Sequence, residues 1–144
     1  MFSNFDKLCF SFINMKKVLI VGPCYADAQS LKKSLESQFS VSTLEVTKAE
    51  EGKNILRQRK IDLILVSRIL AGDKSSGLGF LNYVKKSNPK IPIILLTRFP
   101  EAQKEALEKG AVAAFDIDLF IGYIRSSMEE KREEAIKIIE KLLR

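Results

Sequence analysis

The sequence predicts an α/β protein in which helices cover both faces of a five-stranded parallel sheet. Short continuous runs of β-branched residues and leucine recur along the chain, and segments with helical apolar spacing separate them. Strands that are buried on both faces have such continuous apolar runs. Their alternation with helices implies right-handed crossovers within one sheet. The expected architecture is therefore a three-layer α/β/α sandwich.

Five segments are predicted to form the strands, and those near residues 41 and 112 have the weaker patterns. In a chain of 144 residues the strand order 2-1-3-4-5, known from flavodoxin-like folds, is the expected one. It places a functional crevice outside the carboxyl ends of the first and third strands. The predicted strands are residues 17–21, 41–46, 62–66, 91–96 and 112–115.

Four helices are predicted between these strands from apolar residues at helical spacing. Each presents one apolar face, which is what a helix needs to cover a sheet. The residues that define them are Ala28, Leu31 and Leu35, then Ile55 and Leu56, then Phe80, Leu81 and Val84, and finally Ala102, Ala106 and Leu107.

The carboxyl-terminal stretch, residues 118–144, predicts one helix of about 25 residues. We expect its first half to complete a domain at 15–127 and the rest, 128–144, to extend beyond that domain. An apolar stripe on this extension predicts a partner, with a second copy of the chain as the first choice. Packing of the stripe back onto its own domain is the alternative. The stripe consists of Met128, Ala135, Ile138 and Leu142.

Composition excludes several classes of function. The chain has no histidine, and two cysteines, Cys9 and Cys24, make neither a disulfide framework nor a zinc site. Acidic residues are interleaved with the basic ones, so the net charge of +6 predicts a solvated surface rather than nucleic-acid binding. The amino-terminal extension, residues 1–14, is neither a signal peptide nor a membrane span, and we expect a cytoplasmic protein.

Five segments together resemble the CheY-like receiver domains of two-component response regulators, over about residues 15–125. They stand in the family's order and at about its spacing. The resemblance implies the fold predicted above and a role in signal transduction. The segments are Met15 to Val21, Ile61 to Val66, Gly77 to Leu81, Pro92 to Thr97 and Ala106 to Ala111.

The residues that a receiver needs for phosphorylation are replaced. The resemblance implies an acidic pair after the first strand and an aspartate after the third, which together bind Mg²⁺ and accept the phosphoryl group. Gly22 and Pro23 stand at the acidic pair, and Ser67 stands at the phosphoacceptor. The family's lysine falls on Ile117, or on its neighbour Asp118. Thr97 alone matches the family's hydroxyl residue, so we expect a degenerate phosphoacceptor pocket.

Two arginines, Arg68 and Arg98, follow the third and fourth strands and are candidate anion-binding residues. If both point inward, the pocket is cationic and prefers anions to Mg²⁺, so we expect no metal, no cofactor and no catalytic activity. Cys24 stands at the same crevice, where we expect a small apolar filler, with a redox-sensing thiol as the alternative.

The sequence therefore predicts a phosphorylation-independent module that binds a protein partner in signal transduction. The expected surface comprises the fourth helix, the fifth strand and the last helix. Two alternatives stay open. One is a regulator phosphorylated at a displaced carboxylate such as Asp73, although a solvated turn residue is the favoured interpretation of Asp73. The other is a sensor of a small anion or nucleotide that uses Arg68 and Arg98.

Overall fold

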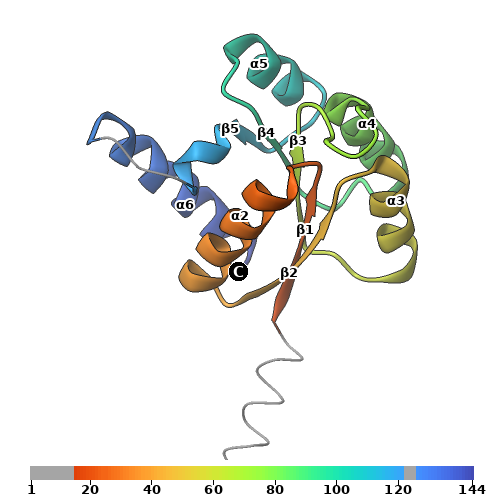
Figure 1. Ribbon diagram of the computed structural model, residues 1–144, viewed down its shortest axis with the longest axis horizontal. Helices are drawn as coiled ribbons and strands as arrows, with labels where there is room; N and C mark the ends of the chain where they lie inside the picture. The colour runs from red at the N-terminus through yellow and green to blue at the C-terminus, as the bar shows by residue number, and fades with distance from the viewer. Residues whose placement is uncertain (1–14, 122–125) are drawn as a thin grey trace, which may run out of the picture.

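A computed structural model describes residues 15–121 and 126–144, and within these ranges strands and helices alternate along the chain (Figure 1). The strands are β1 (Lys16–Val21), β2 (Val41–Val46), β3 (Leu63–Ser67), β4 (Ile93–Leu96) and β5 (Ala113–Phe115). The helices are α2 (Tyr25–Gln38), α3 (Ala49–Gln58), α4 (Gly77–Ser87), α5 (Pro100–Glu108) and α6 (Glu129–Leu142), with short 3₁₀ turns at Ile117–Leu119 and Ser126–Met128.

The five strands form one parallel sheet in the order β2-β1-β3-β4-β5, which confirms the predicted topology. The strand positions are also confirmed, with small differences at the ends. β4 begins at Ile93 rather than at residue 91, and β3 ends one residue later than predicted, at Ser67. At the other end of the sheet, the Asp62 side chain accepts a hydrogen bond of 2.8 Å from the backbone N–H of Lys17, which ties β3 to β1.

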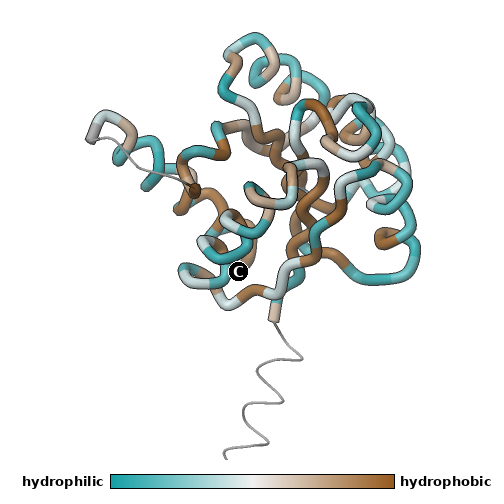
Figure 2. The backbone as a smooth tube through the Cα atoms, viewed as in Figure 1, coloured by the Kyte–Doolittle hydropathy of each residue, from teal (hydrophilic) through white to brown (hydrophobic). Residues whose placement is uncertain are grey.

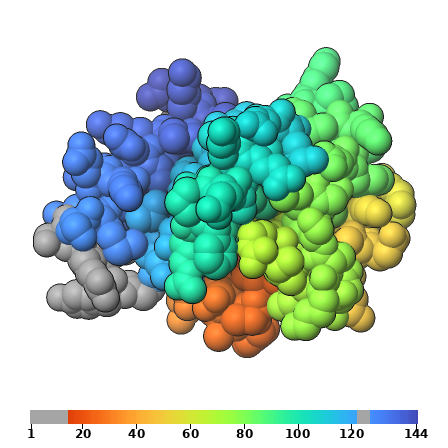
Figure 3. Space-filling model, turned by 90° about the horizontal axis from the view of Figure 1, so that it is seen from above, coloured from red at the N-terminus to blue at the C-terminus, as the bar shows by residue number. Residues whose placement is uncertain are grey.

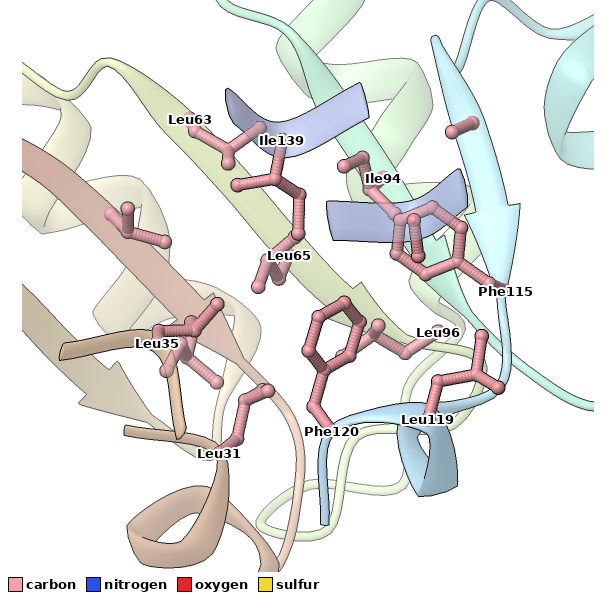
Figure 4. Close-up of a cluster of buried hydrophobic side chains, with 14 of the residues drawn as sticks. Leu31, Leu35, Leu63, Leu65, Ile94, Leu96, Phe115, Leu119, Phe120 and Ile139 are labelled. Atoms are coloured by element: carbon pink, nitrogen blue, oxygen red, sulfur yellow. The ribbon is translucent and has the colours of Figure 1, made fainter. Parts of the chain in front are cut away.

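Alternate residues of each strand enter two separate cores, one on each face of the sheet. Helices α2 and α6 cover one face, and α3, α4 and α5 cover the other. The apolar strands lie between polar outer helix surfaces (Figure 2). Figure 4 shows the core under α2 and α6, where Leu31 and Ile139 face Leu65 of the sheet. Burial of the strands on both faces explains their continuous apolar sequences.

The carboxyl-terminal helix is present, but the prediction that it begins near residue 118 is wrong. The carboxylate of Asp116 accepts a hydrogen bond from the N–H of Asp118 and starts the 3₁₀ turn Ile117–Leu119. Helix α6 begins only at Glu129 and has 14 residues. The regular apolar spacing in residues 118–144 therefore includes 3₁₀ turns that are not part of helix α6.

The predicted interaction stripe on α6 is largely part of the domain's own core. Ala135 is buried, and Met128 and Leu142 are partly buried against the same core. Only Ile138 is substantially exposed, at 37%. Helix α6 thus packs onto its own domain, which was the alternative prediction. The expectation that this stripe is left uncovered by the domain was wrong. In the described residues, no helix has the length and apolarity to cross a membrane.

Candidate functional site

The candidate site lies at the carboxyl ends of the strands, at the top of the molecule in Figure 1. At the end of β1, Gly22 adopts a φ of 106°, a conformation that residues with a side chain rarely adopt. Its N–H donates to the carbonyl oxygen of Val46 (2.9 Å), and its own carbonyl accepts from the N–H of Ala71 (2.8 Å). Gly22 therefore joins β2 to the loop that follows β3. Pro23, the next residue, is buried.

Leu70 fills the space beside Gly22. A Cβ atom on residue 22 would lie 3.0 Å from Cβ of Ser67 and 3.1 Å from Cγ of Leu70, and the Leu70 side chain is fully buried. The loop around Leu70 is closed, because Ile69 and Ser76 form an antiparallel bridge. A side chain at position 22 would therefore crowd Ser67 and Leu70.

Ser67 is half-buried at the end of β3, at the position predicted for the phosphoacceptor. Gly77, the first residue of α4, passes so close that a Cβ atom there would overlap the carbonyl oxygen of Ser67. Ser67 lines a shallow hollow of about 300 Å³ together with Thr97, Arg98 and Ile117. The structure therefore brings most of the predicted pocket residues together.

Thr97 does not offer a free hydroxyl to this hollow. It is buried, and its Oγ1 accepts a hydrogen bond of 3.2 Å from the N–H of Phe99. The side chain of Gln103 donates to its carbonyl oxygen at 2.8 Å, and its N–H donates to Phe115 at 2.9 Å. Thr97 thus stabilises the turn between β4 and α5, which is a structural role at a strand end.

Carboxylates as well as arginines border the hollow, so its charged side chains are of both signs. Asp116 and Asp118 line it beside Arg68 and Arg98. Burial raises the pKa of Asp118, the negative charges of Asp116 and Asp27 raise it further, and Arg98 opposes them. In the described residues, no three potential ligands are placed to hold a metal ion.

Both arginines stack on one aromatic ring. The guanidinium carbon of Arg68 lies 5.0 Å from the centre of the Phe99 ring, and that of Arg98 lies 5.5 Å from it. Phe99 is itself 43% exposed, as is neighbouring Ile69 at 45%. The sequence analysis missed both apolar residues. The only local signal was an apolar residue after an arginine in each of two adjacent loops.

Asp73, the alternative phosphoacceptor, is a turn residue. Its Oδ1 accepts hydrogen bonds from the hydroxyl of Ser75 (2.6 Å) and from the N–H of the same residue (3.0 Å). Its Oδ2 accepts from the N–H of Ala49, the first residue of α3 (3.0 Å). These bonds lower the pKa of Asp73 to about 2, the bond from the Ser75 hydroxyl having the largest effect.

Cys24, the remaining candidate, is exposed immediately before α2. Cys9 lies outside the described residues, so its distance from Cys24 is not defined.

Several solved structures similar to this chain are receiver domains, although no family model and no curated protein sequence matches the chain. The receiver domain of the Francisella response regulator 1452 has a TM-score of 0.69 at 19% identity, covering 89% of this chain and 96% of that one. The NtrX receiver domain from Brucella abortus has a TM-score of 0.69 at 20% identity, covering 88% and 97%.

A third similar structure is the CheY-like receiver domain protein from Methanospirillum hungatei JF-1. Its TM-score is 0.64 at 23% identity, and the match covers 89% of this chain and 98% of that one. Each match covers nearly the whole of the other chain, so the similarity extends over the complete sheet and its helices. With its sheet order 2-1-3-4-5, the chain therefore has the fold of CheY-like response regulator receiver domains.

Proposed function

We propose that the protein is a phosphorylation-independent, receiver-like module of two-component signal transduction that acts in the cytoplasm by binding proteins, without catalysis of its own. The observation that carries the proposal is the set of residues at the carboxyl ends of β1 and β3, where Gly22, Pro23 and Ser67 carry no carboxylate. A phosphorylated receiver needs carboxylates at this place to bind Mg²⁺.

Electrostatics supports the same proposal. Mg²⁺ gives up its water only for a tight octahedral set of oxygen ligands. The two carboxylates that line the hollow, Asp116 and Asp118, both follow β5 and not β1 or β3. A serine in place of aspartate also cannot form an acyl phosphate. Phosphoryl transfer therefore has neither its metal nor its acceptor at this site.

The surface that we propose for protein binding is the α5–β5–α6 face. β5 is an edge strand, and a groove of about 570 Å³ lies over it between α5 and α6. Three exposed apolar side chains line this groove, each contributed by a different segment. They are Leu107 at 51%, Val112 at 46% and Ile138 at 37% exposure. Such a cluster around an unpaired strand edge favours a protein contact.

We propose a second copy of the chain as the occupant of this face, which gives a homodimer. Ile138 is the residue of the predicted stripe on α6 that we expect in the contact. Ala135 is buried in the core of the monomer and is not accessible to a partner. Light scattering during size-exclusion chromatography tests this. Leu107→Lys and Ile138→Lys are expected to shift the protein to monomer, and Tyr25→Lys, a matched change at another exposed apolar residue, is not. A wild-type protein that stays monomeric at all concentrations contradicts the dimer.

The absence of phosphorylation is tested by intact-mass measurement after incubation with acetyl phosphate and Mg²⁺. We expect no mass increase and no change in oligomeric state. A gain of one phosphoryl group would contradict the proposal and point to a displaced acceptor. In that case Asp73→Asn identifies whether Asp73 is the residue modified.

A further inference from the structure

Two arginines and two exposed apolar residues from the loops after β3 and β4 form one surface, which we call the ridge. We define the ridge as Arg68, Ile69, Arg98 and Phe99, which follow the adjacent strands β3 and β4. In the view onto the carboxyl ends of the strands (Figure 3), the loop after β3 lies beside the beginning of α5. Both apolar members of the ridge are more than two-fifths exposed. Arginine and large apolar residues together are typical of the energetic centre of protein interfaces.

A groove of about 390 Å³ runs beside the ridge between α4 and α5. Arg68, Ile69 and Phe99 form one side of the groove, and Leu78 and Ala102 contribute apolar surface to the rest. The groove is thus apolar along much of its length and has a guanidinium group at its edge. An apolar side chain that enters it would bury Ile69 and Phe99, and burial of apolar surface is favourable.

Arg68 is the charged group of the groove that has no carboxylate partner. Within the ranges 15–121 and 126–144, neither Arg68 nor Arg98 lies within 4.0 Å of a carboxylate oxygen. Of the two glutamates that line the groove, Glu105 pairs with Lys109 at 4.0 Å, and Glu101 lies in the first turn of α5, where the helix dipole favours a negative charge. The guanidinium of Arg68 is therefore available to a carboxylate of a partner.

We propose that this ridge and groove bind a segment of a partner protein in which a carboxylate side chain stands next to a large apolar side chain. The apolar side chain enters the groove against Ile69 and Phe99. The carboxylate accepts hydrogen bonds from Arg68, whose planar guanidinium is held ready by its stacking on Phe99. The groove between α4 and α5 shares no lining residue with the groove of the α5–β5–α6 face, although Arg98 of the ridge also lines the latter.

The position of the acidic residues separates this proposal from small-anion binding. On the other side of Phe99, Asp116 and Asp118 line the hollow around Ser67 and repel a free phosphate there. In the groove, burial of an apolar side chain contributes to binding together with the charge of Arg68. A ligand that has both an apolar side chain and a carboxylate is therefore favoured over an anion alone. Inorganic phosphate is therefore expected to compete weakly with a peptide for this surface.

The test is selection of a random peptide library displayed on phage against the full chain. Enriched sequences are expected to carry aspartate or glutamate within two positions of leucine, isoleucine or phenylalanine. The selected peptide is then synthesised and its affinity measured by titration calorimetry. Phe99→Ser and Arg68→Glu should each weaken its binding at least about tenfold. A peptide with lysine in place of its acidic residue should bind Arg68→Glu better than the wild type.

Matched controls keep the result specific. Arg59→Glu makes the same charge change at the end of α3, and Tyr25→Ser replaces another exposed aromatic ring with a polar side chain at the start of α2. Both should leave the affinity unchanged, and circular dichroism confirms that each variant is folded. The proposal is overturned if no peptide is enriched, if enriched peptides lack acidic residues, or if the ridge variants bind as well as the controls. Equal competition by inorganic phosphate would also overturn it and support a small-anion site.

Discussion

The carboxylate of Asp73, in the loop after β3, accepts a hydrogen bond of 3.0 Å from the backbone N–H of Ala49, the first residue of α3. The first N–H groups of a helix have no partner within the helix, and here a residue from a distant loop supplies one. A second bond in the same region, from the N–H of Gly72 to the carbonyl oxygen of Thr47 (2.9 Å), joins the same two segments. The loop that closes over Gly22 is thus fixed to its neighbours at several points.

The first prediction concerns the pH dependence of stability at Asp73. Its pKa falls from 3.8 to about 2 on folding because of the bonds from Ser75 and Ala49. A carboxyl with a lowered pKa in the folded state contributes stability above its unfolded pKa, and this contribution is lost as the pH falls from about 3.8 toward 2. Urea unfolding of wild type and Asp73→Ala should therefore give a difference at pH 5 that shrinks toward pH 2. A difference independent of pH would contradict the role of the charge.

Ser75→Ala serves as the companion variant. It removes the hydroxyl donor, which has the largest effect on the Asp73 carboxyl, but leaves the backbone bonds in place. We expect the pKa of Asp73 in this variant to lie between the wild-type value and 3.8. Carboxyl resonances followed by NMR titration measure it directly.

The second prediction is that Leu70 stabilises the fold rather than only closing the site. Its side chain is fully buried beside Gly22, so Leu70→Ala leaves a cavity and should lower the free energy of unfolding by about 2–5 kcal/mol. Ile69→Ala changes the adjacent, exposed residue and should cost less than about 1 kcal/mol. Urea titration distinguishes the two. Equal losses would mean that Leu70 is not packed as described.

The third prediction concerns the backbone at Lys74, which has a φ of 61°. Left-handed backbone costs a residue with a side chain roughly 1–2 kcal/mol, whereas glycine adopts it freely but loses more entropy on folding. Lys74→Gly should therefore stabilise the protein by up to about 1 kcal/mol. Lys74→Val, with a β-branched side chain at the same φ, should destabilise it. Thermal unfolding of the two variants should give shifts of opposite sign.

The sequence predicted the sheet well because continuous apolar runs have a simple cause, burial on both faces. It also identified Gly22, Pro23 and Ser67 as replacements at the phosphorylation positions, since each directly follows or ends a predicted strand. Leu70 could not be found in the same way. A single leucine in a polar loop has no periodicity, and its burial depends on hydrogen bonds to segments that are distant in the sequence.

The error at the carboxyl terminus has a different origin. Apolar residues before and after the 3₁₀ turns keep a spacing of three and four, so the pattern alone predicts one continuous helix. The carboxylate of Asp116 caps the start of the first 3₁₀ turn, this turn ends at Leu119, and α6 begins only at Glu129. The sequence analysis did not single out Asp116.

The last prediction follows from the position of α6 in the fold. Ile139 is fully buried between α6 and the sheet, whereas Ile138, the preceding residue, faces the groove over β5. Ile139→Ala should therefore lower the free energy of unfolding by about 2–5 kcal/mol, and Ile138→Ala by about 1 kcal/mol.

A chain that ends at Ser127 should lose cooperative unfolding altogether, because the apolar face of β1, β3 and β4 that α6 covers would meet water. Heteronuclear NMR of the truncated chain would show this as a collapse of signal dispersion. If the truncated chain keeps a dispersed spectrum and a cooperative transition, α6 is an accessory helix and the domain ends before it.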